Sequence, residues 1–320
     1  MYETGTHKNY LLNAAGIPIA NPPDGSVIDY YYIQSHLLPQ RRKIDYAYVQ
    51  DEWNFSRDWM LTAGVRHDRY TDFGGSTNPR VALVWDIDQD LTAKLLYGNA
   101  FRAPSFTEQY GINPVANGNP DLKPEKIRTW ETALNWQARG DMQLNVGFFH
   151  YDMLDMIRAV ANTAPAVGAT FQNAGKQHGN GIEVEAVWDA TRSVRIDANY
   201  AYQKSIDEAT GQDAGSAPHH HLYVRADWSY TGDWMLSGQV NRVADRHRAA
   251  GDARPPIADY TTVDLTLHST RSMKTWDVAA SVRNLFNADV REPSLAPGTA
   301  IPYDFPMPRR SVWLQASYNF

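Results

Sequence analysis

The last ten residues of the chain, 311–320, alternate between two kinds of side chain. Counting back from the C-terminus, every second position is apolar or aromatic, and the positions between are polar except Trp313. The apolar set is Val312, Leu314, Ala316, Tyr318 and Phe320. A period of two places successive side chains on opposite faces of a β-strand. The segment therefore predicts a strand with one apolar and one polar face, as found in soluble β-sandwiches and in transmembrane β-barrels.

The same alternation recurs along the chain, for example over 61–66, 91–98, 182–188, 194–202 and 276–283. Its polar positions include charged residues in mid-strand, such as Glu183, Glu185 and Arg195. Charged positions of this kind are typical of a barrel wall whose polar face lines a watery lumen. We place 13 strands at about 43–55, 59–71, 77–87, 91–101, 126–138, 142–162, 169–188, 193–205, 219–230, 233–247, 258–269, 273–285 and 308–320.

The connections between these strands alternate in length. Tight turns fall at Ser56–Asp58, Asp88–Asp90, Arg139–Asp141, Asp189–Arg192, Tyr230–Gly232 and Thr270–Ser272. Longer loops fall at Thr71–Ser76, Arg102–Glu125, Asn162–Gly168, Ile206–Pro218, Arg248–Ile257 and Ala288–Met307. Every second connection of an up-and-down meander lies on the same side, so all tight turns share one side. This asymmetry is typical of outer-membrane barrels, whereas a Greek-key sandwich mixes loop lengths. The prediction is an all-β, antiparallel up-and-down transmembrane β-barrel.

Composition narrows the alternatives. A mean hydropathy of −0.51 and the lack of an apolar run of about 18–20 residues exclude a transmembrane helix but not a barrel. There is no cysteine, which excludes disulfides and thiolate metal sites, and the net charge of −6 argues against a nucleic-acid partner. The 10 tryptophans and 18 tyrosines suit aromatic girdles at membrane interfaces. Residues 1–20 lack the pattern of a signal peptide.

Four segments carry sequence motifs in a fixed order: NAFRAPSFTEQY (99–110), NPDLKPE (119–125), NAGKQHGNGIEVE (173–185) and RNLFNADVREP (283–293). Together with the C-terminal Phe they resemble the C-terminal part of a TonB-dependent outer-membrane receptor, over roughly residues 42–320. The family imports ferric siderophores, haem, cobalamin and other nutrients. The motif residues are Phe101, Arg102, Ala103, Pro104, Asn119, Pro120, Asp121, Leu122, Lys123, Pro124, Glu125, Arg283, Asn284, Leu285, Phe286 and Asn287.

The resemblance implies a barrel of about 22 strands around a plug domain. The 13 predicted strands leave the plug and about nine strands outside this sequence, so we expect a chain truncated at its N-terminus. Residues 1–41 are expected to be a partial extracellular loop, and 42–320 the C-terminal portion of the barrel. Tyr318 and Phe320 would act as the barrel assembly signal. The last strand would run toward the periplasm, with Val312, Leu314, Ala316 and Tyr318 facing lipid and Ser317 and Asn319 the lumen.

The expected partners follow from the same resemblance. They are the lipid bilayer and lipopolysaccharide of the bacterial outer membrane, the barrel assembly machinery, and a ferric siderophore as ligand. The TonB complex would act only through the missing N-terminal region, so energised uptake is not expected from the chain alone. Two other functions stay open: a passive outer-membrane channel of about 14 strands, and a soluble all-β binding protein.

Arg102, Tyr110 and Lys123 are the candidate ligand-binding residues. Arg and Lys would offer charge to an anionic ferric chelate and Tyr an aromatic wall. The alternative is that the loop only shapes the barrel rim. FRAP and NPDL also resemble the paired boxes of haem receptors, but residues 105–118 contain no histidine to ligate haem, which favours a siderophore.

Two further clusters receive structural interpretations. His219, His220 and His221 open a strand, where two of the three share a face, but no carboxylate stands close in sequence, so no metal site is predicted. Glu183 and Glu185 are spaced like a glycosidase pair and are interpreted as lumen-lining groups. No catalytic set and no cofactor site are predicted, and the chain is not expected to be an enzyme.

Overall fold

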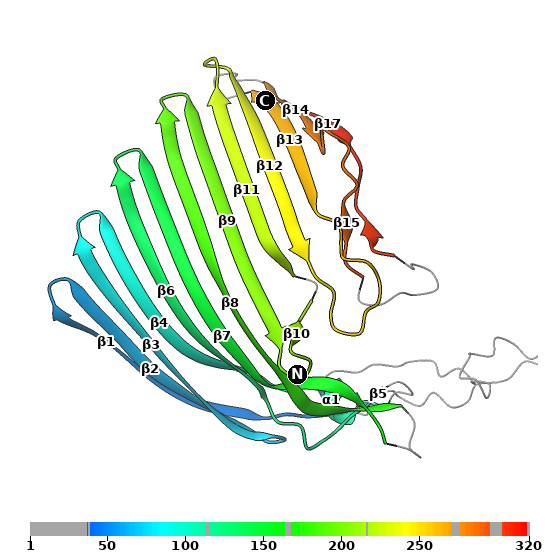
Figure 1. Ribbon diagram of the computed structural model, residues 1–320. Helices are drawn as coiled ribbons and strands as arrows, with labels where there is room; N and C mark the ends of the chain where they lie inside the picture. Colours follow the sequence, from blue (N-terminus) through cyan, green and yellow to red (C-terminus); the bar gives the residue numbers. More distant parts are fainter. Residues whose placement is uncertain are drawn as a thin grey trace, which may run out of the picture.

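The computed structural model describes residue 37 and residues 39–112, 116–163, 168–215, 217–269, 276–294 and 303–318. Within these residues, 13 long strands form one antiparallel sheet in the order of the chain (Figure 1). They are β1 (Ile44–Ser56), β2 (Trp59–Tyr70), β3 (Gly74–Asp88), β4 (Leu91–Arg102), β6 (Glu125–Arg139), β7 (Met142–Ala161), β8 (Ala169–Thr191), β9 (Val194–Asp207), β11 (Pro218–Ser229), β12 (Trp234–Arg246), β13 (Tyr260–Ser269), β14 (Trp276–Arg283) and β17 (Ser311–Tyr318). The predicted meander is confirmed.

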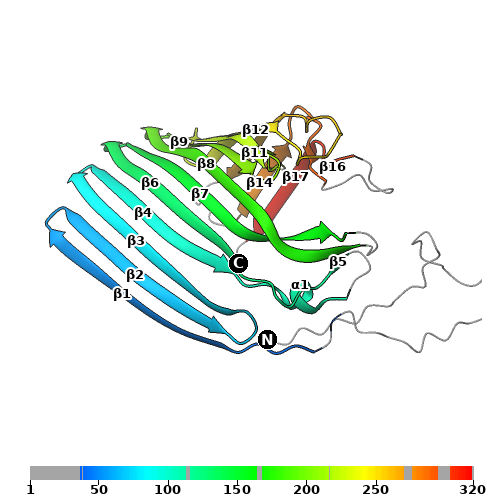
Figure 2. The same cartoon turned by 60° about the horizontal axis from the view of Figure 1, so that its bottom comes forward.

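Figure 2 shows the sheet bending from β1 round to β17, as the wall of a barrel does. These two strands stand at opposite ends of the strand order, and in the described part of the chain they do not pair with each other. The sheet is therefore a wall segment rather than a closed barrel. None of the described helices is long and apolar enough to cross a membrane.

Short elements lie within the long connections. They are α1 (Phe106–Tyr110), β5 (Ala116–Asn117), β10 (Gln212–Asp213), β15 (Arg291–Glu292) and β16 (Phe305–Pro306). β5 pairs with β8 in parallel, β10 pairs with β9, and β15 with β16. The long connections thus contain short elements, which the sequence patterns did not predict.

The hairpin turns gather at one end of the sheet and the long connections at the other (Figure 1). We call these the turn end and the loop end. The described end of β17, at Tyr318, pairs with Trp276 at the start of β14 and lies at the turn end, so the last strand runs from the loop end to the turn end. The predicted turn at Thr270–Ser272 and the terminal Phe320 lie outside the described residues, as do residues 1–36 of the predicted N-terminal loop.

One predicted loop, Thr71–Ser76, is wrong. β3 begins at Gly74, which pairs with Tyr70, so only Thr71–Phe73 turn the chain. Gly74 has a φ of +92°, a conformation that L side chains rarely adopt. The glycine therefore closes a tight turn at the loop end, where the sequence pattern suggested a longer loop.

Strand register gives the sheet an apolar face and a polar face. On β17, Val312, Leu314 and Ala316 lie opposite Val282, Ala280 and Val278 of β14. The same apolar layer continues through the neighbouring strands, and its large side chains are uncovered: Leu314 is 81% exposed and Trp130 is 51% exposed. So large an exposed apolar surface is expected where lipid, not water, is the solvent.

The turn end of the apolar face carries a belt of indole rings. Eight of the 10 tryptophans of the chain share this face near the turns: Trp53, Trp59, Trp85, Trp136, Trp188, Trp228, Trp234 and Trp276. Trp59 and Trp85 stack with their centroids 4.9 Å apart. Amphipathic rings prefer the headgroup layer of a bilayer, so the belt marks a membrane–water interface.

The polar face is crossed by hydrogen-bonded ladders that run from strand to strand. Asn135 donates to Asn145 at 2.7 Å, and Asn145 donates to Glu185 at 3.4 Å. Glu183 shares this face with Glu185, in agreement with the lumen-lining interpretation. Such ladders satisfy polar groups without a packed core, which suits a hydrated wall.

Candidate functional site at the loop end

Arg102 ties three elements together at the end of β4. Its guanidinium donates to both carboxylate oxygens of Glu108 in α1, at 2.9 and 3.0 Å, and to Glu125 at the start of β6, at 2.6 Å. Glu125 in turn accepts from the backbone N–H of Ile157 on β7, at 2.7 Å. Both carboxylates are mostly buried. The charge of Arg102 is thus already matched within the loop.

Glu108 also closes a capping box with Ser105 at the start of α1. The Ser105 hydroxyl accepts from the Glu108 N–H at 3.2 Å, and the Ser105 N–H donates to the Glu108 carboxylate at 2.7 Å. Burial raises the pKa of the Glu108 carboxyl, but the hydrogen bonds from Arg102 and Ser105 outweigh it and lower the pKa below its ordinary value. The spacing Ser-x-x-Glu is a helix-start signal that could have predicted α1.

Arg42 holds the same loop from the other side and was not found from the sequence. It donates to Asp72, at 2.6 Å, to the carbonyl oxygen of Pro104, at 2.7 Å, and to Gln109, at 2.9 Å. The rings of Tyr70, Phe73 and Phe106 surround it, with centroids 4.8 to 5.7 Å from its guanidinium carbon. The FRAP segment therefore packs over the enclosed guanidinium of Arg42.

The NPDLKPE segment is fastened to β8. The Lys123 N–H donates to the Asn173 side chain, and the Asn173 amide donates back to the Lys123 carbonyl, both at 2.8 Å. Asn119 donates to the Phe171 carbonyl at 3.0 Å, while Leu122 is buried. The loop motif and the NAGKQHGNGIEVE motif of β8 thus contact each other.

The three predicted ligand-binding residues lie in one loop but in different environments. Arg102 is ion-paired as described above. Tyr110 is half-buried at the end of α1, with its ring 6.3 Å from Phe106. Lys123 is exposed, and its ammonium makes no ion pair within the described residues. Lys123 therefore offers the accessible charge, whereas Arg102 organises the loop.

The RNLFN segment forms the turn that ends β14. Asn284 and Asn287 have positive φ values of 51° and 56°. The buried Asn284 amide donates to the Ala288 carbonyl at 2.9 Å and accepts from the Ala288 N–H at 2.8 Å. Arg310 donates its backbone N–H to Asn287 at 3.1 Å, and Arg283 lies over the Trp313 ring. These motif residues shape the entry into β17, whereas Phe286 is 73% exposed.

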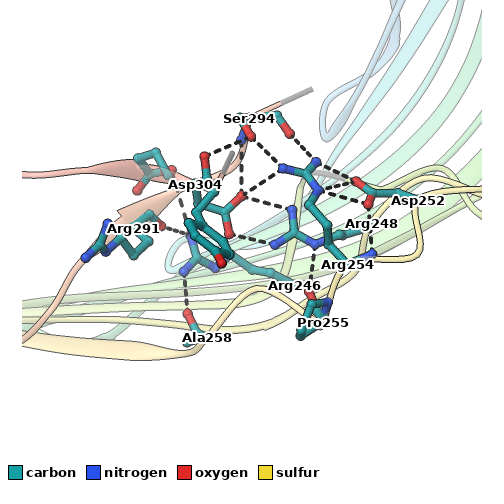
Figure 3. A network of polar contacts seen from close by, with 11 residues as sticks. Arg246, Arg248, Asp252, Arg254, Pro255, Ala258, Arg291, Ser294 and Asp304 are labelled. Atoms are coloured by element: carbon teal, nitrogen blue, oxygen red, sulfur yellow. Dashed lines mark hydrogen bonds and ion pairs between the residues drawn. The ribbon is translucent and has the colours of Figure 1, made fainter. Parts of the chain in front are cut away.

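A network of arginines joins the β12–β13 connection to the β14–β17 connection (Figure 3). Arg248 binds both carboxylate oxygens of Asp304, at 2.9 and 2.6 Å. Arg254 binds Asp252 and donates to the Ser294 hydroxyl at 2.7 Å. The buried Arg246 donates to the carbonyl oxygens of Arg291, at 2.8 Å, and Ala258. We call this network the loop strap; the bonds that join its two connections span 40 to 56 positions, so no sequence pattern pointed to it.

The polar face also holds a groove near its first strands, with a volume of about 520 Å³. Its lining includes Tyr48, Arg66, Tyr70, Asn78 and Arg80. Arg66 is paired with Asp68, whereas Arg80 is exposed and makes no ion pair in the described part of the chain. Guanidinium and phenol groups on a wet wall can bind an anionic ligand without covalent chemistry.

The expectation that His219 lacks a nearby carboxylate is wrong. Folding brings Asp213 and Asp245 within hydrogen-bond distance of its two ring nitrogens, and His247 stacks on its ring. Asp213 is only six positions away, and Asp245 lies on the neighbouring strand β12. His219 and His221 do share the polar face, as predicted, while His220 lies on the other.

Comparison with known proteins identifies the family of this sheet. The family described as TonB dependent receptor-like, β-barrel matches residues 3–285. The iron-regulated outer membrane virulence protein of Vibrio cholerae is 27% identical over 267 residues, covering 76% of this chain and 41% of the relative. The ferrioxamine B receptor of Salmonella typhimurium is 26% identical over 217 residues, covering 62% of this chain and 29% of the receptor.

Solved structures share the fold. A mutant of the ferric enterobactin receptor of Pseudomonas aeruginosa superposes with a TM-score of 0.75 at 19% identity, over 88% of this chain and 45% of the receptor. The chain thus spans less than half the length of each of these relatives.

Proposed function

The chain belongs to the TonB-dependent receptor-like β-barrel family, and on that premise we propose that it forms part of an outer-membrane receptor that takes up a ferric siderophore. The relatives named above include receptors for ferrioxamine B and ferric enterobactin, which supports an iron chelate as the cargo. These relatives are receptors rather than enzymes, and transport needs binding groups rather than a catalytic set.

The observation that carries this proposal is the two-faced sheet with the bonded loops at its loop end. The exposed apolar face and its tryptophan belt suit a wall in lipid. The polar face and the fastened loops suit a vestibule that meets a ligand from outside the cell. A soluble binding protein would have to cover the apolar face, which no described element does.

Within this receptor we assign Lys123, Tyr110 and Arg80 to the ligand side and Arg102 to positioning of the FRAP loop. Lys123 and Arg80 are exposed cations whose charges are not matched by carboxylates of the described residues. An anionic ferric chelate would supply that charge. The proposed partners are lipid, lipopolysaccharide, the barrel assembly machinery and the TonB complex.

Chelate binding to the purified full chain in detergent tests the proposal. Tryptophan fluorescence is followed during titration with a ferric hydroxamate, a ferric catecholate and haem, each compared with its iron-free form. We expect saturable quenching by one ferric siderophore only, weakened about tenfold or more in Lys123→Ala or Arg80→Ala, because loss of one charge-assisted hydrogen bond costs about 1.5 kcal/mol or more.

Arg192→Ala is the matched control, since Arg192 is an exposed cation at the turn end of the sheet. It should bind the chelate like the parent chain. Absence of any ferric-specific binding by a chain that is folded by circular dichroism would contradict the siderophore proposal. Stepwise ion conductance in a planar bilayer would then support the passive channel.

A further inference from the structure

His219, Asp245 and His247 bring two imidazoles and one carboxylate together at the loop end of the polar face. His219 and Asp245 hold opposed positions on β11 and β12, between the paired residues Pro218–Arg246 and His220–Ala244. The His219 Nδ1 atom lies 2.9 Å from one Asp245 oxygen, and the His247 Nε2 atom lies 3.0 Å from the other. One ligand atom from each of the three residues fits within 4.8 Å of the others.

A fourth residue orients the cluster. The other ring nitrogen of His219, Nε2, lies 2.6 Å from Asp213 on β10, and the His219 side chain is only 8% exposed. A carboxylate that accepts the second N–H of a histidine fixes the tautomer and leaves the other nitrogen free to bind a metal. Asp213 is placed to do this, which turns the Nδ1 lone pair of His219 toward Asp245.

The two carboxylate contacts of His219 leave a place for one positive ion. A neutral imidazole carries one N–H and one lone pair. His219 faces a carboxylate oxygen with each ring nitrogen. If its N–H points to Asp213, the lone pair of Nδ1 faces an Asp245 oxygen, and the two repel. A proton or a metal ion between them removes the repulsion.

We propose that His219, His247 and Asp245 bind a divalent transition-metal ion of the zinc or copper class at the loop end, with Asp213 orienting His219. Imidazole nitrogen with one carboxylate oxygen is the ligand set that such ions prefer, whereas calcium and magnesium prefer oxygen ligands only. Three protein ligands leave a fourth position of a tetrahedron to water or another ligand. This inference does not rest on the siderophore proposal.

The spacing needs a small adjustment to hold the ion: the widest separation closes, and the contacts of 2.9 and 3.0 Å with Asp245 open by about 0.3–0.4 Å. Ligand atoms of tetrahedral zinc stand about 3.3 Å apart, given bonds of about 2.0–2.1 Å. The separation of up to 4.8 Å would therefore shrink by roughly 1.5 Å at most. Asp245 and His247 are half exposed and can make this movement, while His219 stays fixed by Asp213.

The ion would cross-link the loop end of the sheet. Asp213 lies in the β9–β11 connection, His219 on β11, and His247 in the β12–β13 connection next to Arg248 of the loop strap. Metal binding should thus order the rim on the lumenal side, where a passing ligand would meet it. We infer a rim-ordering role for a metal bound by the protein itself, separate from any chelated iron.

Zinc titration of the full chain, purified without a histidine tag and treated with chelator, tests this inference. Isothermal titration calorimetry should show one Zn²⁺ site per chain. Cu²⁺ should compete for the site, and a large excess of Ca²⁺ or Mg²⁺ should not. Asp213→Asn should weaken Zn²⁺ binding about 10- to 100-fold, the usual effect of losing an orienting carboxylate.

His247→Ala is the main variant, because His247 is half exposed and its loss should not disturb folding. It should lose the site, and Asp245→Asn should do the same. His221→Ala is the matched control: His221 lies on the same face of β11 but bonds Asn241 at 2.7 Å, so Zn²⁺ binding should stay unchanged. Folded parent chain without a stoichiometric site, or equal binding by His247→Ala and His221→Ala, would overturn the proposal; in either case a proton alone joins the cluster.

Discussion

At the scale of single residues, the loop end depends on side chains that make several directed bonds at once. Arg42, Arg102 and Arg246 each bond groups from two or more segments of the chain. A guanidinium has five donors in a planar fork, whereas a lysine ammonium is a single point charge. Arginine therefore links the segments of the rim around a few buried apolar side chains, such as Phe106 and Leu122, and lysine would not replace it.

The turn after β14 gives a prediction at this scale. Asn284→Ala loses two hydrogen bonds and places an ordinary residue at a φ of +51°, so we expect a loss of about 2–4 kcal/mol in the free energy of unfolding. Asn284→Gly loses the same bonds but tolerates the backbone, so it should be about 1 kcal/mol less destabilised. Urea unfolding of the refolded chain in lipid vesicles measures both.

Phe286→Ala is the control for these variants, because its ring is 73% exposed and two residues away. It should unfold within about 0.5 kcal/mol of the parent chain. Equal stability of the alanine and glycine variants at position 284 would show that the backbone conformation does not contribute.

At the scale of elements, the loop strap links two long connections by charge and predicts a pH dependence. Hydrogen bonds from Arg248 lower the pKa of Asp304, and those from Arg254 lower the pKa of Asp252 to about 2. A carboxyl with a lowered pKa in the folded state stabilises that state above its ordinary pKa of 3.8 and loses this contribution as the pH falls toward the folded value. The strap should therefore loosen between about pH 4 and pH 2.

Hydrogen exchange of the Ser294 amide reports this loosening, because that N–H donates to Asp304 at 3.3 Å. After correction for the intrinsic rate, its protection should fall across this pH range. Asp304→Asn should lack protection already at pH 6 and show no further change. Protection that is constant from pH 5 to pH 2 in the parent chain would contradict the role of the carboxylates.

Local sequence patterns predicted the long strands but not the contacts between distant residues. The alternation of apolar and polar residues predicted all 13 long strands within the described residues. Each strand of a two-faced sheet repeats the same two-residue period along its length. The tight turn at Gly74 was predicted as a longer loop, and α1 was not predicted, although its capping-box spacing is a local signal. Contacts such as Arg248–Asp304, 56 positions apart, and His219–Asp245, on neighbouring strands, depend on strand pairing and loop return, which no local pattern records.

At the scale of the whole molecule, the stability of the sheet depends on which solvent meets each face. The apolar face exposes its large side chains and carries the tryptophan belt, while the polar face carries hydrogen-bonded ladders. In water the apolar face would promote aggregation. In a bilayer, lipid covers this face. A strand should therefore lose stability when a charge is placed on its apolar face and keep its stability when a charge is placed on its polar face.

Two neighbouring residues of β9 test this asymmetry. Ala198 lies on the apolar face opposite Ala186 and Val224, and Asn199 lies on the polar face opposite Glu185 and Tyr223. Ala198→Arg puts a charge against lipid and should cost about 2–4 kcal/mol of unfolding free energy if it lies near the bilayer midplane. Asn199→Arg gains a carboxylate neighbour and should change stability by less than about 1 kcal/mol. Denaturant titration in phospholipid vesicles measures both, and equal losses for the two variants would mean that lipid does not cover the apolar face.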